Sequence, residues 1–291
     1  MPTIEQTIDS AALRFLRAIV GKSQHVFDVD DAHGVAIQMG LSKGYAHQLL
    51  HRLLKAGWIY NVRRGLYASA GKLPGYSIAH DYAIATRLVK PSALCRFTAL
   101  SYHELTEQIP LRAVHVMTPK KVVTPGMRSG SKPEGRDRHA WVIGGVNYEY
   151  FHVKPEHFFG IERVYVAGHL WVPMTDKERT VLDLFVAPSW AGSFESIYGI
   201  LKQSISSEAI DLKKLAGYAI KYGEGSLVKR LGWCLEELGA SEEILQPLLE
   251  MRISGYRVLD PERVAHGKCN KRWMVIENLA ADHEVQLSKT P

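Results

Sequence analysis

The feature that most constrains this sequence is a long stretch near its amino terminus that has no acidic residue. Between Ala32 and His80 there is no aspartate or glutamate, although the 291-residue chain has 30 of them and a formal net charge of +6. Because the overall charge is modest, the position of the positive charge matters more than its sum. A locally basic surface is suited to contacting phosphate groups. The lysines and arginines of this stretch are Lys43, Arg52, Lys55, Arg63, Arg64 and Lys72.

Hydrophobic periodicity predicts three helices in the same part of the chain. The first helix is expected to end at Gly21, and a short extended stretch over 25–27 separates it from a second helix over 30–39. A third helix is predicted over 43–55, with the Ser42 hydroxyl accepting a backbone N–H bond at its amino end. Its apolar residues form one stripe, so the opposite face is polar and basic.

The segment after the third helix has the pattern of a hairpin with a basic tip. The run 58–62 leads to Arg63-Arg64-Gly65, and the chain returns through 66–68. Three helices followed by a basic hairpin is the order of a winged helix-turn-helix, a fold that can place one helix in the major groove of DNA. We therefore predict that residues 1–73 form a winged helix-turn-helix DNA-binding domain.

Eight side chains of this domain are candidate DNA contacts. The first turns of a helix in the major groove can present side chains to base edges, whereas other cations touch phosphates and position the domain. The competing interpretation is an amphipathic helix and a hairpin whose charges are simply solvated; Tyr45 could also be a core residue, and His51 could only flank the groove. The predicted base-reading residues are Lys43, Tyr45, His47 and Gln48, and the predicted phosphate contacts are Arg52, Lys55, Arg63 and Arg64.

The remainder of the chain predicts a larger mixed α/β domain, residues 76–285, after a short linker at 73–75. Helical patterns over 77–89 and 98–106 precede the alternation that is typical of strands. The predicted strands are 113–117, 139–143, 148–153 and 164–172. Between the first two strands, a loop over 119–138 is rich in glycine, proline and charge; its role stays open between a solvated loop and a contact for nucleic acid or an acidic partner.

The carboxyl-terminal half is predicted to be mostly helical, which makes the fold class α+β. One helix begins near Thr175, because Thr175 and Glu178 have the spacing of a capping box. Arg179 and Asp183, four residues apart, are expected to pair across one turn. Further helices are predicted over 194–204, 212–222, 226–238 and 242–251.

No motif for catalysis, a metal or a cofactor is recognisable. His103-Glu104 lacks the second histidine of a zinc protease motif, the glycine pairs lack the spacing of a phosphate-binding loop, and no serine stands in GxSxG. The three cysteines form no CxxC pair and are expected to be buried or inert thiols. The acids Asp176, Glu178 and Asp183 are interpreted as caps and surface pairs. We therefore expect no catalytic residue, no metal and no cofactor.

The sequence offers no hydrophobic segment for a membrane. Its longest apolar runs are a few residues, and the start MPTIEQTIDS has neither a basic region nor an apolar core of an export signal. No membrane partner is expected, and the predicted location is the cytoplasm.

Several short motifs, taken in order, carry a resemblance to a known family. They are Arg63-Arg64-Gly65-Leu66-Tyr67, the segments 92–100 and 105–110, the segment 175–184, and Asn270-Lys271-Arg272-Trp273. The sequence resembles the AbiEi antitoxins of bacterial abortive-infection systems over about residues 8–280. The basic loop over 119–138 has no counterpart that we can place in that family, and many relatives have a glycine where His103-Glu104 stands.

The resemblance implies an antitoxin that represses its own operon by binding inverted repeats of double-stranded DNA through the winged helix. It also implies that the carboxyl-terminal domain neutralises a cognate nucleotidyltransferase toxin in phage defence. Direct toxin contact, and dimerisation in solution or only on DNA, stay open. The alternatives are a winged-helix transcription factor with a ligand-sensing or dimerisation domain, and a nucleic-acid-processing enzyme that uses Asp176 or Glu178.

Overall fold

The computed structural model describes residues 10–23, 25–73, 78–107, 112–123, 140–167 and 170–279. Its helices and strands confirm the predicted α+β class. The predicted linker at 73–75 and the predicted basic loop over 119–138 lie mostly outside the described residues. Contacts divide the chain into two compact units: the first comprises 1–94, 111–153 and 163–174, and the second comprises 95–110, 154–162 and 175–291.

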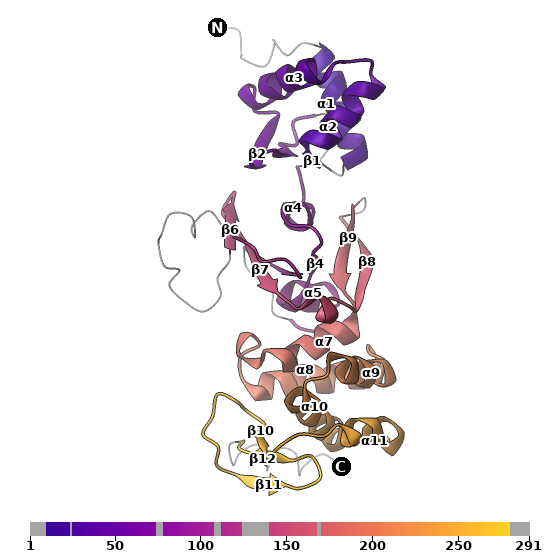
Figure 1. Ribbon diagram of the computed structural model, residues 1–291, viewed down its shortest axis with the longest axis vertical. Coiled ribbons are helices and arrows are strands. Elements are labelled where there is room, and N and C mark those ends of the chain that lie inside the picture. Colours follow the sequence, from indigo (N-terminus) through magenta and orange to yellow (C-terminus); the bar gives the residue numbers. More distant parts are fainter. Residues whose placement is uncertain are drawn as a thin grey trace. The chain divides into compact units, whose positions relative to one another are not determined.

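The amino-terminal part of the first unit is built on three helices around one apolar core (Figure 1). These are α1 (Ser10–Ser23), α2 (Val29–Gln38) and α3 (Lys43–Lys55), and α3 has the bounds that the periodicity predicts. Phe15, Leu16 and Ile19 of α1 are fully buried, as are Leu49 and Leu53 of α3. Burial of this apolar surface stabilises the arrangement by about 1.5–3 kcal/mol for each large side chain.

Polar groups fix where the second and third helices begin. Asp28 and Asp31 form a capping box at α2: the Asp31 N–H donates to Asp28 at 2.9 Å and the Asp28 N–H donates to Asp31 at 3.0 Å. The Ser42 hydroxyl accepts from the Tyr45 N–H at 3.2 Å, as predicted. Gly40, at φ 70°, allows the sharp turn between the two helices. The result is a helix-turn-helix pair.

A small antiparallel sheet completes this part of the molecule. Its strands are β1 (Val26–Asp28), β2 (Ile59–Arg63) and β3 (Leu66–Ser69), in the order β1-β3-β2. The predicted hairpin is therefore present, with Gly65 at φ 75° in its turn and a register shift between Asn61 and Arg63.

The rest of the first unit is a six-stranded mixed sheet with one helix against it, α4 (Asp81–Leu88). The sheet order is β6-β7-β5-β4-β9-β8. Two tyrosines of β7 donate to α4, Tyr148 to Asp81 at 2.7 Å and Tyr150 to the Ala85 carbonyl at 2.5 Å. The strands are β4 (Ala93–Leu94), β5 (Ala113–Thr118), β6 (Ala140–Ile143), β7 (Val146–His152), β8 (Ile161–Val166) and β9 (Leu170–Thr175).

Three predicted elements differ from the observed ones. The helix predicted over 77–89 begins at Asp81, because the His80 ring caps it by accepting from the Tyr82 N–H and Ile78 is used in a bridge to Ala70. The helix predicted over 98–106 is α5 (Arg96–Tyr102). The single strand predicted over 164–172 is wrong: β8 and β9 are separate strands, and the chain leaves β8 at Ala167 with φ 51°.

The second unit is mostly helical, as predicted. Besides α5 it contains α7 (Lys177–Val186), α8 (Phe194–Ser206), α9 (Leu212–Tyr222), α10 (Gly225–Glu237) and α11 (Glu242–Glu250), with short helices η2 (Pro155–His157) and η3 (Pro188–Trp190). The sequence missed a small sheet made of β10 (Arg257–Val258), β11 (Lys268–Asn270) and β12 (Val275–Glu277). Next to it Trp273 is fully buried against α10, where a Cβ at Gly232 would overlap its indole.

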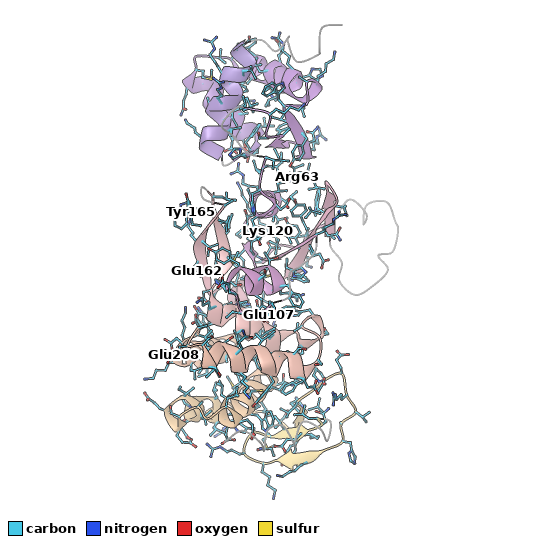
Figure 2. All side chains as sticks on the ribbon, turned by 180° about the vertical axis from the view of Figure 1, so that it is seen from behind. Arg63, Glu107, Lys120, Glu162, Tyr165 and Glu208 are labelled. Atoms are coloured by element: carbon cyan, nitrogen blue, oxygen red, sulfur yellow. The ribbon has the colours of Figure 1, made fainter. Side chains whose placement is uncertain are left out.

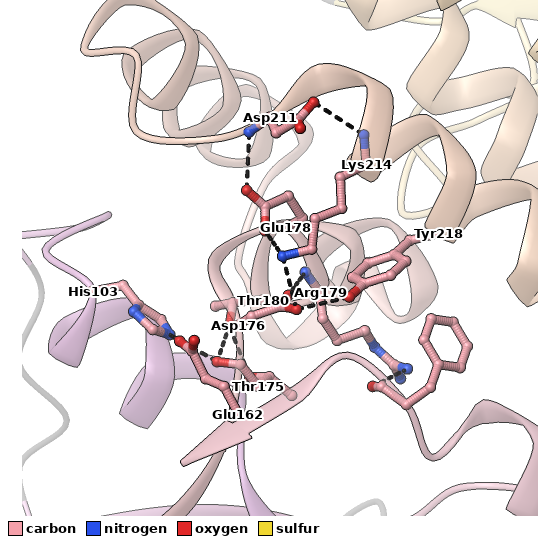
Figure 3. Close-up of polar contacts among 11 residues, drawn as sticks. His103, Glu162, Thr175, Asp176, Glu178, Arg179, Thr180, Asp211, Lys214 and Tyr218 are labelled. Carbon is pink, nitrogen blue, oxygen red and sulfur yellow. Dashed lines mark hydrogen bonds and ion pairs between the residues drawn. The ribbon is translucent and has the colours of Figure 1, made fainter. Parts of the chain in front are cut away.

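Buried charged side chains fix the amino end of α7 (Figure 3). The residue that caps this helix differs from the predicted one. Asp176 is the cap, since its carboxylate accepts from the Arg179 N–H at 2.8 Å. Thr175 cannot serve, because it is the last residue of β9 and its hydroxyl pairs with Thr180 at 2.7 Å. The predicted capping box between Thr175 and Glu178 is therefore wrong.

The predicted pair of Arg179 and Asp183 is confirmed, but it is buried rather than on the surface. The Arg179 Nε donates to Asp183 at 2.9 Å, and its Nη1 donates to the carbonyls of His157 at 2.6 Å and Phe159 at 3.2 Å. Burial raises the pKa of Asp183, and the Arg179 guanidinium opposes that rise. The pair thus holds the η2 segment against α7.

Glu178 connects α7 to α9. Its carboxylate accepts from the Asp211 N–H at 2.9 Å and from the Lys214 ammonium at 2.7 Å, and Lys214 also lies 3.1 Å from Asp176. Burial acts to raise the pKa of Glu178, but the bonds from Lys214 and Asp211 outweigh it and hold that pKa below its usual 4.5. The ionised form of Glu178 is therefore the one that the fold stabilises.

Replacing Glu178 with glutamine is expected to lower the free energy of unfolding by roughly 1.5–3 kcal/mol at neutral pH, the usual contribution of a hydrogen bond to a charged group. Because the folded-state pKa is depressed, this contribution is complete above the unfolded value of 4.5 and is lost as the pH falls through the folded value. Thermal unfolding of parent and Glu178→Gln between pH 7 and pH 3 measures it.

The exposed Glu250 provides the control, since Glu250→Gln should unfold like the parent across this range. A difference between parent and Glu178→Gln that stays constant down to pH 3 would contradict the assignment of the stabilising charge to Glu178.

Candidate nucleic-acid interface

The exposed face of α3 is the candidate interface. Ala46, Leu49, Leu50 and Leu53 of this helix are buried in the core of the helix-turn-helix part. Burying one face of a helix turns the residues between them to solvent. The exposed side chains of α3 are Lys43, His47, Gln48, His51, Arg52 and Lys55, which include five of the eight predicted contacts.

The electrostatics of this face suit an anionic partner. Lys43 is exposed at the amino end of α3, where the helix dipole adds partial positive charge. Arg52 and Lys55 are exposed in its last turn. Ser42 already caps the Tyr45 N–H, so the amino end is ordered without a ligand. The face therefore presents cations at both ends, with polar groups between them.

A shallow depression lies on this face and is lined by His47, Gln48, His51 and Arg52. His47 is also joined to α2, because its Nε2 lies 3.2 Å from the Nε2 of His33. Sequence reasoning missed His33, since it is 14 positions away and nothing in its local pattern points to His47. His47 and His51, four residues apart, lie on the predicted polar face of the helix.

Tyr45 is less available than the other predicted base-reading residues. Its side chain is half-buried and packs against the helix-turn-helix core. The sequence left open whether Tyr45 belongs to the core. In the structure, Tyr45 does pack against the core.

The two arginines of the hairpin, Arg63 and Arg64, are exposed. β2 runs from the end of α3 toward α4 in Figure 1, and Arg63 lies beside α4 in Figure 2. Burial raises the pKa of Tyr150, and the positive charge of Arg63 opposes that rise, which places Arg63 within electrostatic reach of β7. The Arg63 side chain also reaches the Arg64 carbonyl at 3.5 Å.

An ion pair ties the helix-turn-helix part to α4. Arg87 of α4 contacts the Asp31 carboxylate and lies 3.8 Å from Asp28, the two acids of the α2 capping box. Burial acts to raise the pKa of Asp28, but the Asp31 N–H and the Arg87 charge outweigh it and lower that pKa. The acids that begin α2 therefore also anchor it.

The described residues were also compared with the requirements of other kinds of site. No group of three or more histidine, cysteine, aspartate or glutamate residues there could hold a metal ion. Cys95 and Cys234 are buried and burial raises the pKa of both thiols, whereas Cys269 is exposed. Asp176, Glu178 and Asp183 are all engaged in the contacts around α7. A search of the described helices finds none with the length and apolarity that crossing a membrane requires.

Comparison with known proteins gives one family and one fold. Residues 14–70 match the family described as "Transcriptional regulator, AbiEi antitoxin". The crystal structure of the RV2827C protein from Mycobacterium tuberculosis resembles this structure with a TM-score of 0.60 over 98% of this chain and 97% of that one. At 13% sequence identity, that likeness shows the fold alone. No curated protein sequence matches the chain.

The matched range contains most of α1 and all of α2, α3 and the hairpin, so it coincides with the part of the chain that carries the candidate interface. The resemblance seen in the sequence is thereby confirmed for this region. Residues 14–70 are therefore similar to the AbiEi antitoxins, a family of transcriptional regulators.

Proposed function

We propose that this protein is a DNA-binding autorepressor and antitoxin. Residues 1–73 act as a winged helix-turn-helix that binds operator inverted repeats, and the larger region, residues 76–285, counteracts a cognate nucleotidyltransferase toxin in phage defence. The observation that carries the DNA-binding half is the exposed polar and basic face of α3, in a stretch of sequence without acidic residues.

The arrangement of elements supports a winged helix. α3 follows a tight turn after α2, and the sheet of β1, β3 and β2 is joined to its carboxyl end. In such domains the helix after the turn lies in the major groove, which is wide enough to admit it. The apolar stripe of α3 is buried against its own domain, so the polar face is the one that is free to enter the groove.

The residues of that face divide into two roles. Gln48 and His47 lie in the middle of the face and carry groups that can read base edges. Lys43, in the first turn of α3, is kept with these base-reading residues, whereas Arg52 and Lys55 carry charge in the last turn and suit phosphates. Arg63 and Arg64, on the hairpin, would contact phosphates beyond the groove that α3 occupies.

The neutralising half of the proposal rests on the family of residues 14–70 together with the size of the remaining chain. The helical second unit has its own apolar core and its own polar anchor at α7. A separate core allows the protein to act on a second partner without using the face of α3.

Replacing both hairpin arginines, Arg63→Ala with Arg64→Ala, should weaken binding to any duplex and lower the slope of log affinity against log salt by roughly one to two. The physical reason is that each phosphate contact releases counterions. Titration of operator DNA across salt concentrations measures it. The double variant Lys202→Ala with Lys271→Ala removes the same charge from exposed sites on the second unit and should leave the slope unchanged. If the hairpin variant keeps the parental slope, the hairpin is not part of the DNA contact.

Replacing Gln48 with alanine should change which bases are preferred, at a cost of about 1–3 kcal/mol for the correct base, since a groove-facing amide can pair with adenine. Selection from a randomised DNA pool compares the parent, Gln48→Ala and Lys55→Ala. Lys55→Ala, on the same helix, should bind more weakly yet select the parental site. Recovery of the parental site by Gln48→Ala would remove that residue from base recognition.

The two halves of the proposal can be separated in the full-length protein. A variant that replaces Lys43, His47, Gln48 and Arg52 with alanine should lose repression of the operon promoter and still restore growth when the adjacent toxin gene is expressed. All four side chains are outside the buried stripe of α3, so the fold should be kept, which circular dichroism checks. Loss of growth rescue by a folded variant would show that neutralisation requires the DNA-binding face.

A further inference from the structure

His33 of α2 and His47 of α3 are arranged as a pair. Their Nε2 atoms are 3.2 Å apart, their ring centroids are 4.9 Å apart, and the ring planes are inclined by 84°. His33 is half-buried and His47 is exposed, so the space next to both nitrogens is open to solvent. Two interactions can hold imidazole nitrogens this close: an N–H···N hydrogen bond, or a shared metal ion.

The two ring distances distinguish these interactions. In a straight N–H···N bond of this length the centroids would be about 5.5 Å apart, because each nitrogen lies about 1.1–1.2 Å from its own centroid. Two imidazoles bonded to one tetrahedral ion at about 2.0–2.1 Å have nitrogens about 3.3–3.4 Å apart and centroids about 5.1–5.4 Å apart when their axes point at the ion. The observed centroid distance of 4.9 Å is too short for aligned ring axes and is nearer to the second geometry than to a straight bond.

The chemistry of the pair fits the same kind of ion. Neutral imidazole nitrogens are preferred ligands of zinc, nickel and copper ions, whereas magnesium prefers oxygen. α3 carries no carboxylate, and the acids of α2, Asp30 and Asp31, lie in its first turn, before His33.

We propose that His33 and His47 bind one divalent ion of the zinc class through their Nε2 atoms, with water in the remaining positions. The described residues contain no cluster of three ligands, so this is a site of two protein ligands. An ion held there connects α2 directly to α3, the two helices of the helix-turn-helix. The inference concerns metal binding by the free protein and does not rest on the proposed function.

The test measures zinc binding to purified full-length protein without a histidine tag, by isothermal titration and by the shift of the unfolding temperature. One zinc ion per chain is expected, with an unfolding temperature that rises with zinc concentration, because a ligand that binds only the folded state stabilises it. His33→Ala and His47→Ala should each lower the affinity at least tenfold and remove the temperature shift. Magnesium should produce neither effect.

His266→Ala is the matched control, because His266 is an exposed histidine of the second unit. That variant should bind zinc as the parent does, and circular dichroism should show all three variants folded. No zinc binding by the parent, equal binding by all variants, or loss in only one of His33→Ala and His47→Ala would overturn the proposal, the last result because a shared ion requires both nitrogens.

Discussion

Burial of the apolar stripe of α3 is the constraint on which the candidate interface depends. Ala46, Leu49, Leu50 and Leu53 lie in the core between the three amino-terminal helices, and each leucine contributes about 1.5–3 kcal/mol by leaving water. A rotation of α3 about its axis would expose these side chains. The helix therefore has one stable orientation, and the same packing that stabilises the domain decides which polar side chains face a partner.

The sequence predicts elements well where a local signal and the packing agree. α3 has the predicted bounds because its stripe is regular and Ser42 caps it. The start of α7 shows the opposite case: Thr175 and Asp176 are both able to cap a helix, and the sequence does not say that the Thr175 hydroxyl is already paired with Thr180. Only the path of β9 into α7 decides between them, and that path is a property of the folded chain.

The features of the candidate site also fall into those that the sequence could predict and those that it could not. The exposure of Lys43, His47 and Gln48 follows from the period of one helix, so it could be predicted. The pairing of His33 with His47 and the position of Arg63 next to α4 could not, because each depends on residues brought together from distant parts of the sequence. A sequence pattern assigns a residue to a face of its own element, and it carries no information about the neighbour on another element.

Arg87 attaches the helix-turn-helix part to α4. Asp28 and Asp31 cap α2 and also meet the Arg87 guanidinium, while Asp81 at the other end of α4 accepts from Tyr148 of β7. The same short helix is therefore bonded to the start of α2 and to β7, the strand next to the edge strand β6 of the six-stranded sheet. For this reason the contacts group the sheet with the helix-turn-helix, although the linker composition places a boundary between them. A displacement of α4 would therefore break two sets of contacts at once, the Arg87 ion pair at the start of α2 and the bond from Tyr148 to Asp81.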